Sequence, residues 1–292
     1  MRVGMISQLL WSRYGDLWER LITGVGLEAH HAAPEEVVRA LQDERLEAVS
    51  GFAFRLAAAE ALAFEDADVI LAPELNPGAD SLRGGGQDPF VSSFPEALSA
   101  SVSGLPPVLG VPASLEGNVE TLVVSTLHAL TRDSALVRRV WERQRTSARA
   151  VKRAEPRWRV RPSEGGTVGI VAQPWLLREE VVRAALVGTE AHSSQHWVSQ
   201  SQLDSAMLRA EGLRVDERLI PTDSEVLGAA RYLGRKGGVS QLVMIADATS
   251  GADAWLVGRV QKLTHKPLEV VYLQDILEPD ALTTAFLPAS LS

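Results

Sequence analysis

Short apolar runs alternate with longer amphipathic segments throughout the first half of the chain. The apolar runs predict strands, and the segments whose apolar residues recur every three or four positions predict helices. The predicted strands cover 2–6, 27–33, 46–51, 67–75 and 106–113. The predicted helices cover 9–26, 34–42, 52–64, 118–130 and 134–154. This alternation is typical of a parallel sheet with helices on both faces.

The second half repeats the same alternation. Its predicted strands cover 167–175, 241–251 and 267–273, and its predicted helices cover 176–188 and 252–263. The opening TVGIVAQPWLL, from Thr167, is comparable with RVGMISQLLW, from Arg2. We therefore predict an α/β protein with two doubly wound, Rossmann- or flavodoxin-like halves that face a central cleft. In such folds ligands bind beyond the carboxyl ends of the strands.

An irregular segment that contains Pro156, Pro162, Gly165 and Gly166 separates the two halves. Proline and glycine at this density interrupt regular structure and are common at domain boundaries. We therefore place an N-terminal domain at 1–155, ending in a long basic helix, a linker at 156–166, and a C-terminal domain at 167–292.

The composition indicates a water-soluble globular protein. Hydrophobic residues make up 46% of the chain and charged residues 23%, which is an ordinary balance for such proteins. No apolar run is as long as a membrane helix requires, and the first residues lack the pattern of a signal peptide. We expect a cytoplasmic protein that does not associate with a membrane.

The chain contains no cysteine. It can therefore form no disulfide, it has no thiolate nucleophile, and it offers no sulfur ligand to zinc or to an iron–sulfur cluster. There is likewise no phosphate-binding P-loop and no G-x-S-x-G nucleophile elbow.

Three segments at predicted loops resemble those of a known family. They are SGFAFRLAAAE from Ser50, DPFVSSFPEAL from Asp88 and DATSGAD from Asp247. Together with the opening VGMISQLLWSRYGDLWERLITGVG, they resemble the D-component family of 2-hydroxyacyl-CoA dehydratases. In that family, three cysteines in these segments hold an iron–sulfur cluster that passes an electron into an acyl-CoA. The positions that match them here are Gly51, Asp88 and Ser250, so the cluster ligands are missing.

Other positions keep part of the family pattern. Arg55 keeps the positive charge of the family's lysine, whereas Glu60 stands where the family has a histidine. Pro89, Gly251 and Asp253 match the family's motifs. The resemblance implies a relative that has lost its cluster and dehydratase activity, and that binds an anionic, acyl-CoA-like small molecule or a protein partner without a cofactor. The residues expected to line its cleft are Gly51, Arg55, Asp88, Ser250, Gly251 and Asp253.

The same residues have simpler structural interpretations. Ser250 can cap the helix that follows it, with Asp253 completing an arrangement like a capping box. The stretch RGGGQDP, from Arg83, is either a mobile surface loop or a lid over a ligand. A different, non-redox enzyme would use Asp88 or Glu74 as a general base, although no reaction can be assigned to this pair.

A basic segment between Arg138 and Arg161 is the sharpest unexplained feature. It holds ten Lys or Arg residues against two acids, so it carries +8 while the rest of the chain carries −16. On one long helix, the candidate anion- or partner-binding residues would be Arg138, Arg145, Arg149, Lys152 and Arg153. This segment is a solvated helix face, a site for phosphates or an acidic partner, or a nucleic-acid surface. The acidic remainder favours phosphates of a small molecule over nucleic acid.

The histidines do not indicate a metal site. His192 and His196 are four residues apart, but the stretch between them is poor helix material. His30 and His31 would point to opposite faces of a strand, which disfavours shared coordination of one ion. We therefore expect no bound metal.

Overall fold

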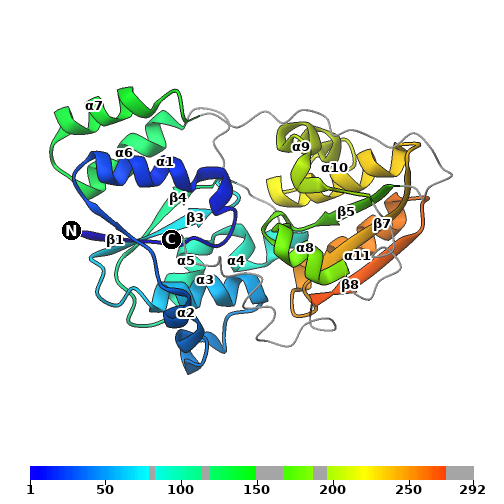
Figure 1. The fold of residues 1–292 in the computed structure, drawn as a ribbon, viewed down its shortest axis with the longest axis horizontal. Coiled ribbons are helices and arrows are strands. Elements are labelled where there is room, and N and C mark those ends of the chain that lie inside the picture. Colours follow the sequence, from blue (N-terminus) through cyan, green and yellow to red (C-terminus); the bar gives the residue numbers. More distant parts are fainter. Residues whose placement is uncertain (79–82, 114–118, 149–166, 187–195, 274–292) are drawn as a thin grey trace. The chain divides into compact units, whose positions relative to one another are not determined.

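The computed structural model describes residues 1–78, 83–113, 119–148, 167–186 and 196–273. The chain divides into two compact units, which we treat separately. The first unit comprises 1–77 and 93–151, and the second comprises 78–92 and 152–291. Residues 78–92 thus pack with the second unit, although they lie within the first half of the sequence. A division of the chain at a single linker does not predict this. Both units are α/β, as the sequence predicts (Figure 1).

The first unit contains a sheet of four parallel strands in the order β2-β1-β3-β4. The strands are β1 (Arg2–Met5), β2 (Glu28–His30), β3 (Val69–Glu74) and β4 (Val108–Pro112). Figure 1 shows α1, α6 and α7 on one face of this sheet and α2, α3 and α5 on the other. Their bounds are α1 (Trp11–Gly24), α2 (Pro34–Ala40), α3 (Phe52–Leu62), α5 (Phe94–Ser101), α6 (Glu120–Leu130) and α7 (Ser134–Gln144).

Two predictions for the first unit are wrong in detail. The apolar run 46–51 is not a strand. It starts at the last residue of a 3₁₀ turn (η1, Glu44–Leu46) and continues as a turn and loop between α2 and α3. Its Leu46 and Val49 are buried, which explains why the run looks like a strand in the sequence. The predicted helix 134–154 ends at Gln144 in the structure, and 149–154 lie outside the described residues.

The second unit contains a second parallel sheet of four strands, in the order β6-β5-β7-β8. The strands are β5 (Thr167–Ala172), β6 (Trp197–Ser199), β7 (Val239–Ala246) and β8 (Leu268–Tyr272). The helices are α4 (Pro89–Ser92), α8 (Glu179–Leu186), α9 (Ser205–Leu213), α10 (Pro221–Arg235) and α11 (Gly251–Leu263). Short 3₁₀ turns lie at η2 (Gly84–Gln87), η4 (Pro174–Leu176) and η6 (Gln200–Gln202).

Helices α9 and α10 are absent from the sequence prediction. The first turn of α10 is polar, with Thr222, Asp223, Ser224 and Glu225, yet all four residues are buried. Polar residues that are buried do not mark the inner face of a helix in the sequence, so the start of α10 does not look like a helix that packs in a core. The apolar part of α10, from Val226 onward, packs in the core of the unit with β5 and β7.

The two sheets have the same topology and the same register. Gly4 of β1 pairs with Ile70 of β3, which pairs with Val108 of β4. In the second sheet Gly169 pairs with Leu242, and Leu242 pairs with Leu268. The similarity of the two opening sequences therefore reflects equivalent strands. Four residues beyond each of these glycines stands a buried glutamine, Gln8 in one unit and Gln173 in the other.

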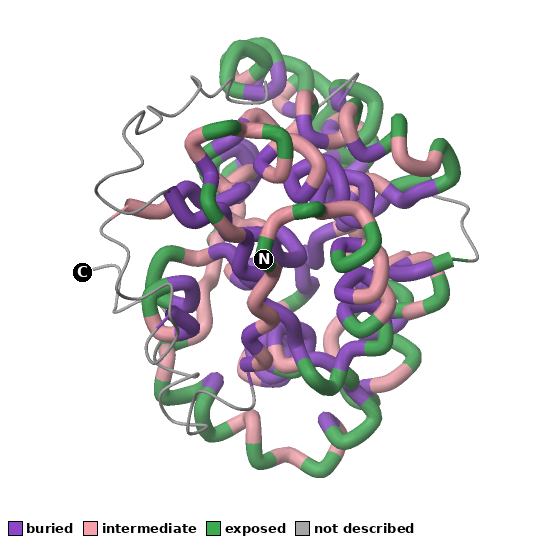
Figure 2. Tube along the Cα trace, turned by 90° about the vertical axis from the view of Figure 1, so that its right-hand side faces the viewer, coloured by how far each residue is buried: buried purple, intermediate pink, exposed green. Residues whose placement is uncertain are grey.

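Buried positions follow the strands and the inner faces of the helices, and exposed positions lie on outer turns and loops (Figure 2). The strands β5 and β7 are buried almost throughout, as expected for a parallel sheet covered on both faces. Within the described ranges, no helix has the length and apolar content needed to cross a bilayer.

Candidate functional site

The stretch with three glycines is not the flexible loop that its composition suggests. Residues Gly84–Gln87 form a 3₁₀ turn, which we call the glycine turn, and Gly84 and Gly85 are buried in the second unit. Gly84 has a φ of +53°, in the left-handed region that favours glycine. A Cβ there would lie 2.7 Å from the ring of Trp255. The glycines therefore allow the glycine turn to pack closely against the Trp255 ring. Residues 79–82, just before the turn, lie outside the described part of the chain.

Asp223, in the first turn of α10, holds the glycine turn. Its Oδ2 accepts a hydrogen bond from the backbone N–H of Gly85 at 2.9 Å, and its Oδ1 accepts one from Nε2 of Gln173 at 3.1 Å. Burial raises the pKa of Asp223 to about 6, although both hydrogen bonds act to lower it. The Oε1 of Gln173 has no hydrogen-bond partner among the described residues.

These groups lie at the carboxyl edge of the second sheet. Gln173 directly follows β5, and Asp247 directly follows β7. After β5 the chain crosses to β6, on one side of the sheet, and after β7 it crosses to β8, on the opposite side. The edge between β5 and β7 is therefore the topological switch point of the sheet. The glycine turn thus packs against the place where doubly wound sheets commonly bind ligands.

Asp253 faces inward and anchors the loop between β7 and α11. Its Oδ2 accepts a hydrogen bond from the backbone N–H of Asp247 at 2.7 Å. The pKa of Asp253 is raised to about 8, first by burial and then by the charges of Asp247, Asp223 and Asp88, although the hydrogen bond from Asp247 acts to lower it. Gly251 is exposed at the start of α11.

Ser250 is the N-cap of α11, as the structural interpretation predicts. Its hydroxyl accepts a hydrogen bond from the backbone N–H of Asp253 at 3.2 Å. The full capping box is not formed, because the Asp253 carboxylate binds Asp247 instead. We expect Ser250→Ala to lower the free energy of unfolding by about 1 kcal/mol, since it removes this cap, whereas Ser250→Asn should retain it without adding a charge beside Asp253. Urea denaturation of both variants measures the difference, and equal losses would contradict a capping role.

Asp88 is also a helix cap. Its Oδ1 accepts a hydrogen bond from the backbone N–H of Phe90 at 2.9 Å, at the start of α4. Partial burial raises the pKa of Asp88. Glu74, the predicted companion of Asp88, ends β3 in the first unit, where burial and then the charge of Glu96 raise its pKa. The two carboxylates therefore belong to different units.

The predicted cleft residues are likewise divided between the two units. Gly51 and Arg55 belong to the first unit, and Asp88, Ser250, Gly251 and Asp253 belong to the second. Gly51 is the N-cap of α3 and has a φ of +86°. Arg55 is exposed, and its backbone N–H donates to the carbonyl of Gly51.

Glu60, which stands where the resembling family has a histidine, is buried in the first unit. Its carboxylate accepts hydrogen bonds from the backbone N–H of Ser7 at 2.9 Å and from the Ser7 hydroxyl at 2.6 Å. The backbone N–H of Gln8 also donates to it, at 3.3 Å. Glu60 thus secures the loop after β1, in which Leu9 and Leu10 have positive φ.

Three arginines surround one carboxylate beside the glycine turn, and sequence reasoning missed them. Arg83, Arg218 and Arg259, which we call the arginine cluster, lie 3.3, 3.7 and 3.7 Å from the carboxylate oxygens of Asp216. The pKa of Asp216 is lowered, first by its hydrogen bond from the backbone N–H of Arg218 and also by these charges. The arginines are scattered along the chain and no spacing rule connects them, so only the fold could reveal them.

The arginine cluster is continuous with the glycine turn. Arg83 directly precedes Gly84, and the guanidinium of Arg259 lies over the ring of Trp255, 5.4 Å from its centroid. That ring packs against Gly84. Arg218 and Arg259 also line a surface depression formed by the loop between α9 and α10. The carboxyl edge of the second sheet thus carries buried acids and, next to them, partly exposed cations.

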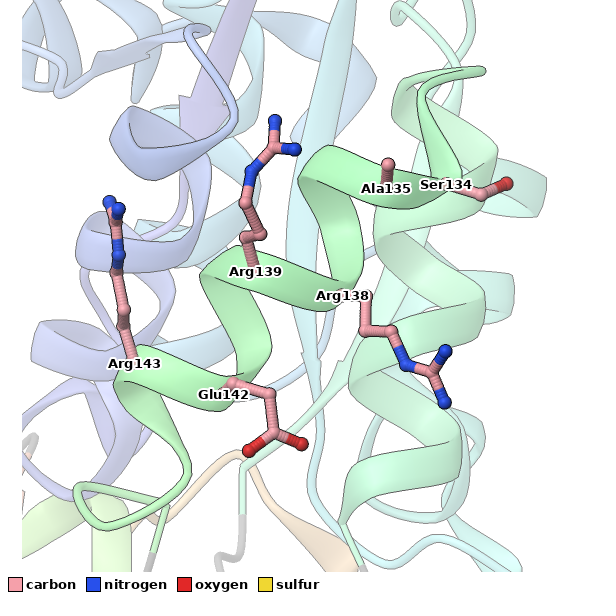
Figure 3. Close-up of a pocket in the computed structure, with 6 residues that line it drawn as sticks. All are labelled: Ser134, Ala135, Arg138, Arg139, Glu142 and Arg143. Carbon is pink, nitrogen blue, oxygen red and sulfur yellow. The ribbon is translucent and has the colours of Figure 1, made fainter.

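The basic segment of the sequence analysis is only partly described. On α7, Arg139 and Arg143 project from one side of the helix, and Arg138 and Glu142 from the other (Figure 3). Glu142 pairs with Arg145 at 3.2 Å, just past the helix end. The face opposite these residues buries Val137, Val140 and Trp141. This is the pattern of an amphipathic surface helix, and Arg149, Lys152 and Arg153 lie outside the described residues.

His30 and His31 each have a nearby polar or charged partner, whereas the buried Nε2 of His196 has no hydrogen-bond partner among the described residues. His30 is 3.2 Å from a guanidinium nitrogen of Arg2, and His31 is 2.9 Å from Glu19. His192 lies outside the described residues. Among those described, no group of three or more His, Asp or Glu residues could hold a metal ion.

Comparison of the chain with protein-family models, curated proteins and solved structures finds no match. The resemblance to the dehydratase D-component therefore stays a prediction.

Proposed function

We propose that the protein binds an anionic small molecule through its second unit, with the arginine cluster as the binding surface. The observation that carries this proposal is the convergence of three guanidinium groups from separate segments on the single carboxylate of Asp216. The cluster directly adjoins the glycine turn, which packs against the carboxyl edge of a parallel sheet, where such folds bind ligands.

Stability alone does not account for this arrangement. Arg83 and Arg218 are about half and almost two-thirds exposed, with 49% and 63% of their side-chain surface accessible. Exposed ion pairs contribute little to folding, and placing like charges together opposes it. Clustered arginines suit the recognition of carboxylate or phosphate groups, because the planar guanidinium can donate two parallel hydrogen bonds.

The proposed activity is binding without iron–sulfur redox chemistry. The chain supplies no thiolate, and oxygen ligands do not substitute for soft sulfur ligands at such a cluster. The acyl-CoA-like ligand that the resemblance implies is one member of the class of anions to be tested.

A thermal-shift screen of the full chain with coenzyme A, ATP and citrate tests the proposal. A ligand present at about 100 times its dissociation constant adds roughly 2.7 kcal/mol to stability, which moves the melting temperature by a few degrees. We expect Arg259→Gln to remove this shift. Arg183→Gln is the matched control, because the partner of Arg183 among the described residues is Glu179, one turn away on α8.

Two outcomes would overturn the proposal. One is that no anion raises the melting temperature of the wild-type protein. The other is that the shift survives both Arg259→Gln and Arg218→Gln. In the same screen, Arg55→Ala tests the cleft that the family resemblance implies, since loss of the shift in that variant alone would place the ligand on the first unit.

A further inference from the structure

Trp255, on α11, contacts two members of the arginine cluster, one directly and one through the glycine turn. The guanidinium of Arg259 lies over its ring, 5.4 Å from the centroid. The two residues are four positions apart on the helix, so they share one face of it. The same ring packs against Gly84, the residue that follows Arg83. Because Asp216 contacts both Arg83 and Arg259, these contacts form a closed circuit.

The backbone of Arg83 is fixed by this packing. Its carbonyl accepts a hydrogen bond from the backbone N–H of Gly86 at 2.9 Å, within the glycine turn. A Cβ at Gly84 would lie only 2.7 Å from the indole, so the turn approaches the ring as closely as a residue without a side chain allows. The indole therefore determines how closely α11 and the glycine turn approach each other, and with it the point from which the Arg83 side chain extends.

The indole is more rigid than the arginines that it contacts. Trp255 is partly buried and packs against the hydrophobic core of the second unit, whereas Arg83 and Arg259 are partly exposed. Long arginine side chains lose much rotamer freedom when a ligand orders them, and this loss weakens binding. A cation above an aromatic ring is held by the electrostatic field of the ring. A ring that orders both arginines before a ligand arrives would therefore raise affinity without contacting the ligand.

From this circuit of contacts, we propose that Trp255 is a positioning residue of the anion site. Its ring holds the Arg259 guanidinium and the start of the glycine turn at a fixed separation, and it acts on a ligand only through Arg259 and Arg83. This inference rests on the proposed function and identifies the residue that orders its binding surface.

Isothermal titration of the full chain with citrate, ATP and coenzyme A tests this inference. We expect Trp255→Leu, which removes the aromatic ring, to weaken binding about tenfold, because flexible arginines must then be ordered by the ligand. Trp255→Phe keeps a planar ring under Arg259, so its affinity should stay within about threefold of the wild-type value. Trp197→Leu is the control, since Trp197 is partly buried in the same unit, at the start of β6. Far-UV circular dichroism checks that each variant is folded.

A pair of glycine variants tests the same contact from the other side, and decides the matter if Trp255→Leu does not fold. Gly84 and Gly78 both have positive φ, +53° and +69°, so alanine strains the backbone at either position. A Cβ at Gly84 meets Trp255 and Asp223, whereas a Cβ at Gly78 meets no described atom within 4 Å. We therefore expect Gly84→Ala to weaken anion binding and Gly78→Ala to leave it unchanged.

The double variant Trp255→Leu with Arg259→Gln separates positioning from a general loss of stability. Residues that act together give losses that do not add, so the double variant should bind little more weakly than Arg259→Gln alone. The inference is overturned if the two losses multiply, if Trp197→Leu weakens binding as much as Trp255→Leu, or if folded Trp255→Leu binds as tightly as the wild-type protein. In these cases the proposed function still stands on the arginine variants. If none of the three anions binds the wild-type protein, the proposed function itself fails.

Discussion

Gly228→Ala is expected to destabilise the second unit by about 3 kcal/mol, near the upper end of the range for overpacked interiors. A Cβ at Gly228, on α10, would overlap the backbone carbonyl oxygen of Leu208 on α9. The mirror contact exists as well, because a Cβ at Gly212 of α9 would overlap the carbonyl oxygen of Ser224. The two helices touch backbone to backbone, so the added methyl group can be accommodated only if they separate.

Gly258→Ala on α11 is the matched control. An added Cβ at Gly258 meets no atom within 4 Å, and alanine favours the helix over glycine by up to about 1 kcal/mol. We therefore expect Gly258→Ala to be neutral or slightly stabilising under urea denaturation. If Gly228→Ala and Gly258→Ala unfold at the same urea concentration, the close approach of α9 and α10 does not exist in solution.

The stability of the protein is expected to fall as the pH rises from 5 to 9, because of two buried aspartates. Burial raises the pKa of Asp253 to about 8 and that of Asp223 to about 6. In the unfolded chain both groups lose their protons near pH 4. Between pH 4 and the raised pKa values the folded state therefore holds more protons, so the contribution of these groups is present at low pH and lost as the pH rises through about 6 and 8.

Asp253→Asn isolates the larger of these effects. One unit of pKa difference corresponds to about 1.4 kcal/mol, so the variant should be more stable than the wild-type protein at pH 9, by up to several kcal/mol. At pH 5 the difference should be small, since an asparagine oxygen can still accept the hydrogen bond from Asp247. Urea denaturation at both pH values measures this, with exposed Asp66→Asn as the control. Two results together would contradict the prediction. The wild-type protein would gain stability from pH 5 to pH 9, and at pH 9 Asp253→Asn would be less stable than the wild-type protein.

The predicted and observed sites differ because burial, and the hydrogen-bond partners of buried carboxylates, depend on tertiary contacts. Ser250 as a helix cap could be predicted, since a cap is a local arrangement that composition and spacing indicate. The carboxylate of Asp253 binds Asp247, only six positions earlier in the chain, whereas the buried hydrogen bonds of Asp223 join it to Gly85 and Gln173, which are distant in sequence. Asp88 and Glu74 seemed suitable companions because they are close in sequence, yet the chain passes from one unit to the other between them.

The sequence by itself determined the α/β class, most strands and helices, and the similarity of the two halves. These properties depend on the spacing of apolar residues along the chain, which can be read from residues that are only a few positions apart. The absence of thiolate chemistry also follows from composition alone. Only the tertiary structure decided that α10 buries a polar first turn, that the glycine turn is packed against Asp223, and that Arg83, Arg218 and Arg259 meet around Asp216. Arg83 and Arg259 are more than 40 positions from Asp216, as Gly85 is from Asp223, and no local pattern records which distant residues the fold will bring together.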